Sequence, residues 1–150
     1  MRPADFIQLM LPGAQASEKI SKVPASFTIA QAALESSWGA RAPGNNLFGI
    51  KADPGWHGKT VDVPTHEYVK GIRTPVIAKF RAYDSWADSV ADHVAFLTSN
   101  PRYKPAFKCI ECADFTRAIA AAGYATDPNY ASIINSIIQT HQLERYDSDV

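Results

Sequence analysis

A chain of 150 residues is long enough for one domain with one hydrophobic core and leaves little room for a second. Its 46% hydrophobic content is ordinary for a globular protein, which argues against a disordered body. Fifteen basic residues balance fifteen acidic ones, so the chain lacks the excess positive charge that non-specific binding to nucleic acid requires. No apolar run approaches the roughly 20 residues of a membrane span, so membrane insertion is not expected.

The first third of the chain is expected to be helical and then to become a loop. Residues 5–23 predict one or two short helices, interrupted or restarted at Pro12, because proline disrupts a helix interior. Ser26 is the expected N-cap of a helix from Phe27 to Trp38, with Gly39 as its stop. Residues 40–60 are rich in Gly, Pro and Asn, which is typical of a loop.

The remaining two thirds predict one hairpin followed by helices. Residues 60–69 and 75–83 are β-branched and aromatic, and "KGIR" lies between them, so a hairpin lobe is expected at about residues 60–83. Three further helices are predicted by their caps and stops, at residues 86–99, 115–122 and 128–143, and the tail after them is expected to fray. The plan is α+β, a helical body with a small β flap.

Glu35 is the only charged side chain between Lys22 and Arg41. On a helical wheel it borders the apolar stripe that contains Leu34 and Trp38, and it falls in the last helical turn. Apolar neighbours and the negative end of the helix dipole both favour the neutral acid, so both raise its pKa. A carboxylic acid held protonated near neutral pH is what a general acid requires. The alternative is a partly solvated Glu, or one bonded to a backbone donor.

The loop "NNLFGIK" at residues 45–51 is a candidate ligand-binding segment. Amide side chains such as Asn46 suit hydroxyl-rich or N-acetyl ligands, and Phe48 offers a flat face for a sugar. The alternative is a tight turn that buries Leu47 and Ile50, and both readings are compatible.

Three more candidate residues for a saccharide site lie in the second half of the chain or just before it. Glu67, in the expected hairpin, is a second carboxylate, although a charged residue on an exposed hairpin is usually only solvated. Tyr124 and Tyr130 flank the start of the last predicted helix, where they either pack or line a saccharide cleft.

Motifs for metals, phosphates and serine nucleophiles are missing from the sequence. The four histidines have no ligand spacing, and "GKT" at residues 58–60 lacks the upstream glycine of a phosphate loop. No G-x-S-x-G elbow occurs. Cys109 and Cys112 cannot form a four-ligand zinc site by themselves, and are expected to be structural thiols or a local disulfide. No metal or cofactor is therefore expected.

Four blocks carry a resemblance to a known family: "AQAALESSWG", "NNLFGIK", "AKFRAYDSWADSVADHVAFL" and "AAGYATDPNYASII". In this order, from about residue 5 to residue 142, they resemble the peptidoglycan N-acetylglucosaminidases of glycoside hydrolase family 73. "NPRY" at residues 100–103 and "AGYATDPNYA" are most similar to the C-terminal hydrolase domains of flagellar rod-assembly members of that family.

The resemblance implies a lysozyme-like fold, with a helical lobe and a β-hairpin lobe flanking a glycan cleft. It implies cleavage of a β-1,4 bond of the bacterial wall on the N-acetylglucosamine side. Glu35 matches the catalytic acid and Glu67 the second carboxylate of the family. The residues expected to contact glycan are Trp38, Asn46, Phe48, Tyr124 and Tyr130.

The resemblance also bears on where the chain works. The N-terminus is a poor signal peptide, because its apolar stretch is broken by Asp5 and Pro12. The sequence alone leaves a cytoplasmic protein, an unusual export route or a fragment open. A flagellar member works in the periplasm and carries an N-terminal rod-binding domain, through which rod proteins are expected partners; a free-standing phage or cell-wall enzyme is the alternative.

Two mechanisms and two rival functions remain open at this point. In the first mechanism, Glu67 activates a water molecule, and the configuration at the anomeric carbon is inverted. In the second, the N-acetyl group of the substrate assists the reaction in place of Glu67, and a tyrosine stabilises that group. One rival is a lytic transglycosylase of the same fold, and the other is a glycan-binding or rod-assembly module without turnover.

Overall fold

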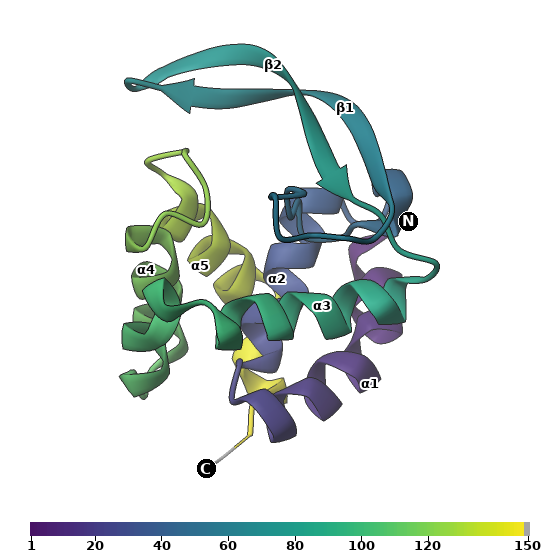
Figure 1. Cartoon of the computed structure of the whole chain (residues 1–150). Helices are drawn as coiled ribbons and strands as arrows, with labels where there is room; N and C mark the ends of the chain where they lie inside the picture. Colours follow the sequence, from purple (N-terminus) through teal and green to yellow (C-terminus); the bar gives the residue numbers. More distant parts are fainter. Residues whose placement is uncertain (149–150) are drawn as a thin grey trace.

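The computed structural model describes residues 1–148 and consists of a helical body with one long β-hairpin arching over it (Figure 1). The α-helices are α1 (Pro3–Ser21), α2 (Ala25–Ser36), α3 (Trp86–Ser99), α4 (Cys112–Ala121) and α5 (Tyr130–Thr140). Short 3-10 segments are η1 (Pro43–Asn45), η2 (Pro101–Lys108) and η3 (Leu143–Tyr146). The hairpin consists of β1 (Thr60–Val69) and β2 (Ile72–Arg81). The α+β prediction is confirmed.

The first helix is continuous, so the predicted interruption at Pro12 is wrong. Pro12 lies inside α1 on its exposed side. The carbonyl of Gln8, which loses its helical N–H partner to the proline, also belongs to an exposed residue and is free to bind water. The opposite face of α1 buries Phe6 and Met10, and this packing holds the helix together across the proline.

The second helix, α2, forms the centre of the body. It packs against α1, α4, α5 and η3, and every residue from Ala25 to Ala33 is buried. It begins two residues before the predicted start, at Ala25, and ends at Ser36. Ser37 and Trp38 then adopt left-handed backbone angles before Gly39, so the chain turns sharply where the helix was expected to continue.

The start of α2 is capped by side chains from distant parts of the chain. Its N-cap residue, Pro24, has no side-chain acceptor. The Glu18 carboxylate instead accepts a hydrogen bond from Ala25 N at 3.1 Å, and Asp147 accepts one from Ser26 N at 2.7 Å. The predicted fraying of the tail is therefore wrong as far as Ser148, whose N–H also donates to Glu18, because this part of the tail is bonded to the start of α2 and the end of α1. Residues 149 and 150 lie outside the described residues.

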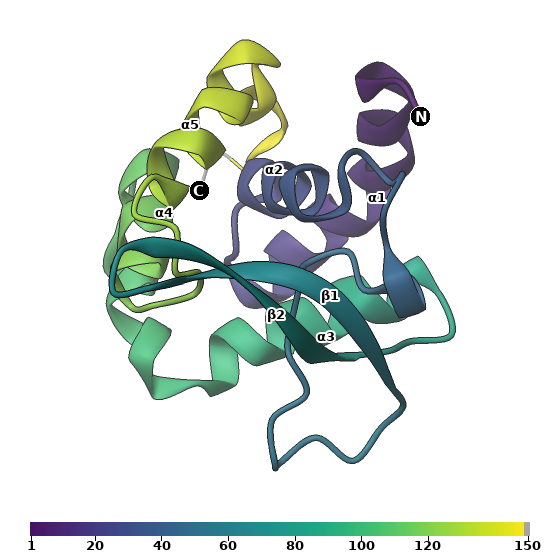
Figure 2. The same ribbon diagram turned by 90° about the horizontal axis from the view of Figure 1, so that it is seen from above.

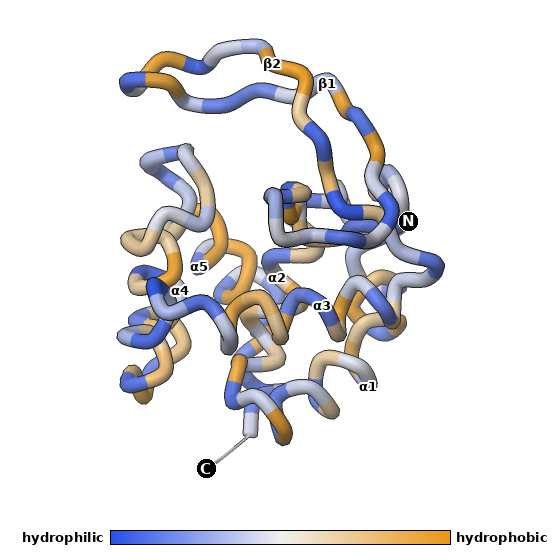
Figure 3. Tube along the Cα trace, viewed as in Figure 1, coloured by the Kyte–Doolittle hydropathy of each residue, from blue (hydrophilic) through white to orange (hydrophobic). Residues whose placement is uncertain are grey.

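The hairpin matches its prediction closely. Lys70 and Gly71 form a two-residue turn with φ of 52° and 80°, the left-handed pair that joins antiparallel strands with their natural twist. Along β1 the more buried residues alternate with exposed ones as far as Glu67, and Figure 3 shows apolar and polar colours alternating in the part of β1 nearest the helical body. Val61, Val63, Thr65 and Glu67 share the more buried face, which we call the underside of the hairpin.

Arg81 anchors the base of the hairpin to the helical body. This last residue of β2 is 8% exposed. Its Nε donates to the carbonyl of Lys51 at 3.1 Å, and its terminal nitrogens lie 3.0 Å from Asp92 and 3.3 Å from Asp53. The guanidinium also lies 4.6 Å from the ring centre of Trp56. One side chain thus joins β2, the loop before β1 and α3.

We expect Arg81→Met to lower the free energy of unfolding by about 3 kcal/mol, because Asp92 and the carbonyl of Lys51 lose a charged donor. Urea unfolding measures the change. The control is Lys79→Met on the same strand, which removes an exposed ion pair with Asp62 at 3.4 Å and should change stability by less than about 0.5 kcal/mol. Equal effects of the two substitutions would contradict the anchoring role.

The later helices differ from prediction mainly in their starts. α3 covers the predicted residues, and its Ser85 cap accepts a hydrogen bond from Asp88 N at 3.1 Å. α4 begins at Cys112 rather than at residue 115, and α5 begins at Tyr130. Cys109 and Cys112 are free thiols, Cys112 being buried. Within residues 1–148, none of the helices is both long enough and apolar enough to span a bilayer.

Candidate active site

Glu35 lies in the last turn of α2, where the loop after the helix folds back against its carboxyl group. Gly49 makes this close approach possible. A Cβ placed on Gly49 would come within 2.8 Å of Glu35 Oε2, and its φ of +64° is a conformation that glycine adopts freely. The sequence "NNLFGIK" therefore covers the carboxyl with backbone rather than with a side chain.

The surroundings of Glu35 favour its protonated form. Burial raises the pKa of Glu35 from 4.5 to about 7, with a hydrogen bond from Tyr130 acting in the lowering direction and the charge of Glu67 in the raising direction. The side chain nevertheless keeps some surface accessible to solvent. Glu35 is thus an acid that is about half protonated at neutral pH and open to a ligand.

Behind Glu35 lies a chain of buried polar groups that the sequence did not reveal. The Tyr130 hydroxyl accepts a hydrogen bond from Gln31 Nε2 at 2.9 Å, and Gln31 Oε1 lies 2.5 Å from His93 Nε2. Gln31 and His93 are fully buried, and Tyr130 is 3% exposed. The available signal was that Gln31 precedes Glu35 by one helical turn on the same face.

Glu67 lies on the underside of the hairpin, near its tip. Its carboxylate forms an ion pair with Lys51 and accepts a hydrogen bond from the Thr126 hydroxyl at 2.9 Å. The same hydroxyl accepts one from Tyr68 N at 2.8 Å. Thr126 belongs to the α4–α5 loop, over which the hairpin tip passes (Figure 2). Glu67 is therefore held at the inner side of the flap rather than simply solvated.

Asn46 and Phe48, two of the predicted glycan contacts, are buried and engaged within their own loop. The Asn46 amide donates to the carbonyls of Ile50 and Arg81, each at 2.9 Å, while its oxygen accepts from two backbone N–H groups of its own loop. Phe48 has no exposed surface and stacks on His93 with the ring centres 3.8 Å apart. The tight turn, which was the alternative reading, uses both side chains to build the loop.

The other three residues predicted to contact glycan are aromatic and lie near the end of α2. Tyr124 is partly exposed, stacks on Tyr130 at 5.9 Å, and donates its hydroxyl to the Phe48 carbonyl at 2.8 Å. Trp38 is also partly exposed, and its ring lies 4.9 Å from that of His141 at the end of α5. The structure thus brings Tyr130 and Tyr124 to Glu35, and places Trp38 on the turn that follows it.

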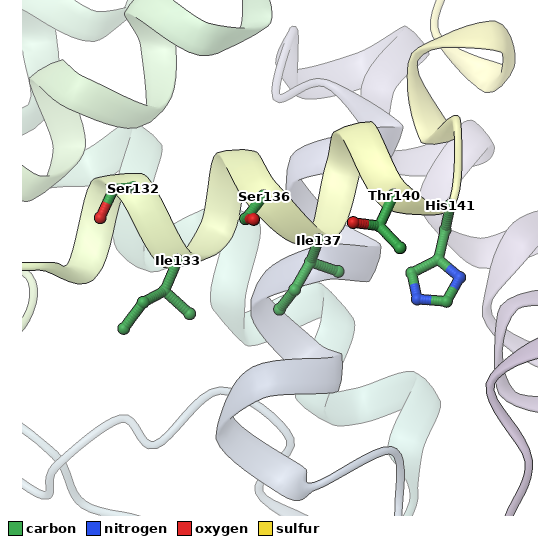
Figure 4. A pocket seen from close by; sticks show the side chains of 6 residues that line it. All are labelled: Ser132, Ile133, Ser136, Ile137, Thr140 and His141. Atoms are coloured by element: carbon green, nitrogen blue, oxygen red, sulfur yellow. The ribbon is translucent and has the colours of Figure 1, made fainter.

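An open hollow of about 520 Å³ follows the outer side of α5. Figure 4 shows Ile133 and Ile137 pointing the same way from the helix, with His141 at its end. The hydroxyl residues Ser132, Ser136 and Thr140 complete the lining. Glu35 does not line this hollow, so the hollow is not the reaction centre. The hollow adjoins Trp38, because its lining residue His141 packs against the Trp38 ring.

Comparison with known sequences agrees with this geometry. The family model described as "Mannosyl-glycoprotein endo-beta-N-acetylglucosaminidase" (Glucosaminidase) matches residues 11–143. Peptidoglycan hydrolase FlgJ of Salmonella typhimurium is 44% identical over an alignment of 143 residues that covers 90% of this chain and 45% of FlgJ. Exo-glucosaminidase LytG of Bacillus subtilis is 38% identical over 87% of this chain and 48% of LytG. The chain spans about half the length of these relatives.

Solved structures of the same kind superpose over nearly the whole chain. A mutant peptidoglycan hydrolase from Sphingomonas sp. A1 matches with a TM-score of 0.86 and 36% identity, covering 97% of both chains. The truncated glycoside hydrolase domain of Salmonella typhimurium FlgJ matches with a TM-score of 0.75 and 39% identity, covering 94% of this chain and 98% of that one. The predicted lysozyme-like fold is confirmed. The chain belongs to the Glucosaminidase family, which is glycoside hydrolase family 73.

Proposed function

We propose that residues 1–150 form a single peptidoglycan-hydrolase domain that cleaves the β-1,4 bond between N-acetylglucosamine and N-acetylmuramic acid. Membership of the family makes the domain a glycosidase. The observation that carries the proposal is Glu35, a carboxyl group in the last turn of α2 that the Gly49 backbone closely covers and that still keeps some surface accessible to solvent. Burial raises its pKa to about 7, and the charge of Glu67 on the hairpin acts in the same direction.

In the proposed reaction, Glu35 donates its proton to the oxygen of the glycosidic bond. The bond between that oxygen and the anomeric carbon breaks, the oxygen leaves as a hydroxyl group, and the anomeric carbon gains oxocarbenium character. Glu35 becomes a carboxylate, and the Tyr130 hydrogen bond, which acts to lower its pKa, stabilises this charged form.

Glu67 is the proposed base for the second half of the reaction. Water attacks the anomeric carbon from the opposite face of the sugar, and its proton passes to the Glu67 carboxylate. The location of Glu67 on the underside of the hairpin supports this role, because a carboxylate there faces the body and not bulk solvent. Assistance by the N-acetyl group of the substrate, with Tyr124 beside the reaction centre, is the alternative for this step.

The glycan strand is proposed to run between the underside of the hairpin and the end of α2. Trp38 and Tyr124, which are partly exposed, are its proposed aromatic contacts. Tyr130 is 3% exposed and stacks behind Tyr124, so its proposed contribution to the site is made mainly through its hydroxyl group beside Glu35. The hollow along α5, which Trp38 adjoins through His141, extends this surface beyond the reaction centre.

The cellular setting is proposed from the named relatives. Several of them are FlgJ peptidoglycan hydrolases, so the substrate class is the bacterial cell wall. We propose a periplasmic domain that opens the wall locally for the flagellar rod, with rod proteins engaged by a part of the parent protein outside this chain.

Product analysis tests the proposed function. Digestion of purified cell wall should release fragments with reducing N-acetylglucosamine ends, identified by mass spectrometry after borohydride reduction. Fragments ending in 1,6-anhydro-muramic acid would replace the proposal with a lytic transglycosylase. Binding to wall without any soluble fragment, in a protein shown to be folded, would replace it with a glycan-binding module.

A further inference from the structure

Behind Glu35, the buried side chains of Tyr130, Gln31 and His93 are joined by hydrogen bonds into a chain of polar groups, which we call the polar chain. The Tyr130 hydroxyl, at its outer end, lies close enough to Glu35 to act on the pKa of that carboxyl group. Gln31 lies on α2 with Glu35, Tyr130 begins α5, and His93 comes from the middle of α3. The separations are 2.9 Å from Gln31 Nε2 to the Tyr130 hydroxyl and 2.5 Å from Gln31 Oε1 to His93 Nε2.

His93 sits in surroundings that keep its imidazole neutral. The ring is fully buried between Phe48, 3.8 Å away and nearly parallel, and Phe27, 6.4 Å away. Burial lowers the pKa of His93 from 6.5 to about 3. A neutral imidazole carries one N–H, and His93 Nδ1 has no hydrogen-bond partner among the described residues. A buried N–H without an acceptor is costly, so the proton belongs on Nε2.

The tautomer of His93 determines the orientation of the Gln31 amide. An N–H on His93 Nε2 needs an acceptor, and the oxygen of Gln31 is the atom that faces it. The NH₂ group of Gln31 then points to Tyr130, whose hydroxyl oxygen accepts from it. In the reverse orientation the Gln31 oxygen would face Tyr130 and compete with Glu35 for the hydroxyl proton.

We propose that His93 and Gln31 are positioning residues that act through Tyr130, directing its hydroxyl proton at the Glu35 carboxylate. The inference rests on the proposed role of Glu35 as the general acid. In this arrangement His93 donates to Gln31, Gln31 donates to Tyr130, and Tyr130 directs its proton at Glu35. Glu35 is the group that becomes charged when the glycosidic bond breaks.

The effect expected on Glu35 follows from the groups that face it. Glu67 from β1 raises the pKa of Glu35, and Tyr130 from α5 lowers it by hydrogen bonding to the charged form. Tyr124 stacks behind Tyr130, and Lys51 neutralises part of the Glu67 charge. If the Tyr130 hydroxyl proton no longer points at Glu35, the influence of Tyr130 that lowers the pKa of Glu35 is lost, and this pKa rises.

The first test needs no substitution and no turnover. A long-range ¹H–¹⁵N NMR spectrum of the wild-type imidazole should show protonated Nε2 and bare Nδ1 for His93, unchanged from pH 8 to pH 5. A proton on Nδ1, or a ring that becomes doubly protonated within this range, would overturn the proposal. Because the readout is independent of catalysis, failure of the proposed function leaves this result unaffected.

The second test is a double-substitution cycle. Tyr130→Phe and His93→Phe should each move the basic limb of the kcat/KM profile on soluble wall fragments to higher pH, Tyr130→Phe by about one pH unit and His93→Phe by less. His93→Phe keeps a flat ring against Phe48. In the Tyr130→Phe background, His93→Phe should produce no further shift, because the path to Glu35 is already cut.

Two controls separate positioning from packing. Gln31→Met keeps a similar length and should reproduce the shift of His93→Phe. Thr28→Val, on the same helix, replaces a buried hydroxyl that has no partner among the described residues and should leave the limb in place. Additive shifts in the cycle, or a folded His93→Phe protein with the wild-type limb, would refute the positioning role.

Discussion

Glu35→Gln should abolish wall hydrolysis and, at alkaline pH, make the protein more stable. A positioned general acid contributes roughly 10²- to 10⁴-fold to rate, and glutamine cannot donate a proton to the leaving oxygen, so kcat should fall by about 10³-fold. Turbidity loss of a wall suspension and release of reducing sugar measure the effect. Full activity in the folded variant would remove Glu35 from the mechanism.

The stability effect of Glu35→Gln has a defined sign. The pKa is about 7 in the folded protein and 4.5 as a free side chain, so the unfolded chain ionises first. The neutral group therefore favours folding fully below pH 4.5, and this contribution is lost as the pH rises to 7. At pH 8 the variant should be more stable by about 3 kcal/mol, and at pH 4 it should equal the wild type.

A matched control distinguishes this effect from the removal of any negative charge. Glu111→Gln neutralises an exposed carboxylate that forms no ion pair among the described residues, and should change neither activity nor the pH dependence of unfolding. Urea unfolding at pH 4 and pH 8 gives the comparison. A pH-independent change in the Glu35→Gln protein would show that its carboxyl is not held protonated by the fold.

Glu67→Gln should lower kcat by about 10²-fold and leave KM nearly unchanged, because it removes the proposed base but keeps the shape of the side chain. The basic limb of the pH profile should also move to lower pH, since the charge of Glu67 raises the pKa of Glu35. NMR of the first product gives the configuration: the α-anomer marks attack by water on the opposite face, and the β-anomer marks assistance by the N-acetyl group.

Thr126→Val separates the charge of Glu67 from the attachment of the hairpin tip. Valine keeps the shape of threonine but loses both hydrogen bonds that join the tip to the α4–α5 loop. We expect it to alter KM more than kcat, because Glu67 keeps its carboxyl group and its ion pair with Lys51. If the Glu67→Gln protein keeps a near-wild-type kcat and releases the β-anomer, the N-acetyl group of the substrate, and not Glu67, performs the second step.

The hairpin and Glu35 are the parts of the molecule that local pattern predicted well. The β-branched and aromatic residues at positions 60–69 and the "KGIR" turn predict paired strands from local sequence, and the structure has them. The orientation of Glu67 is not among these predictions, and the structure places it on the underside. The stripe of apolar residues around Glu35 similarly predicts a half-buried acid in a last helical turn. These features depend on neighbours within a few positions, so sequence reasoning reached them.

The errors arise where distant segments meet. Pro12 was expected to break a helix, but packing of Phe6 and Met10 holds the helix together across it. The tail was expected to fray, yet Asp147 binds the amide of Ser26, more than a hundred residues earlier. Neither outcome is encoded in a local pattern, because each depends on which surface comes to lie beside the segment.

The candidate active site also contains features that local sequence predicts and features that depend on distant contacts. The fold class, the hairpin and one acid at a helix end follow from the amino-acid pattern, because periodicity and capping are local properties. The bonds by which Asn46 and Phe48 build the loop, and the location of Gln31 and His93 behind Tyr130, follow from the packed structure. The physical reason is that hydrogen-bond partners and burial are set by the packing of α2, α3 and α5 together.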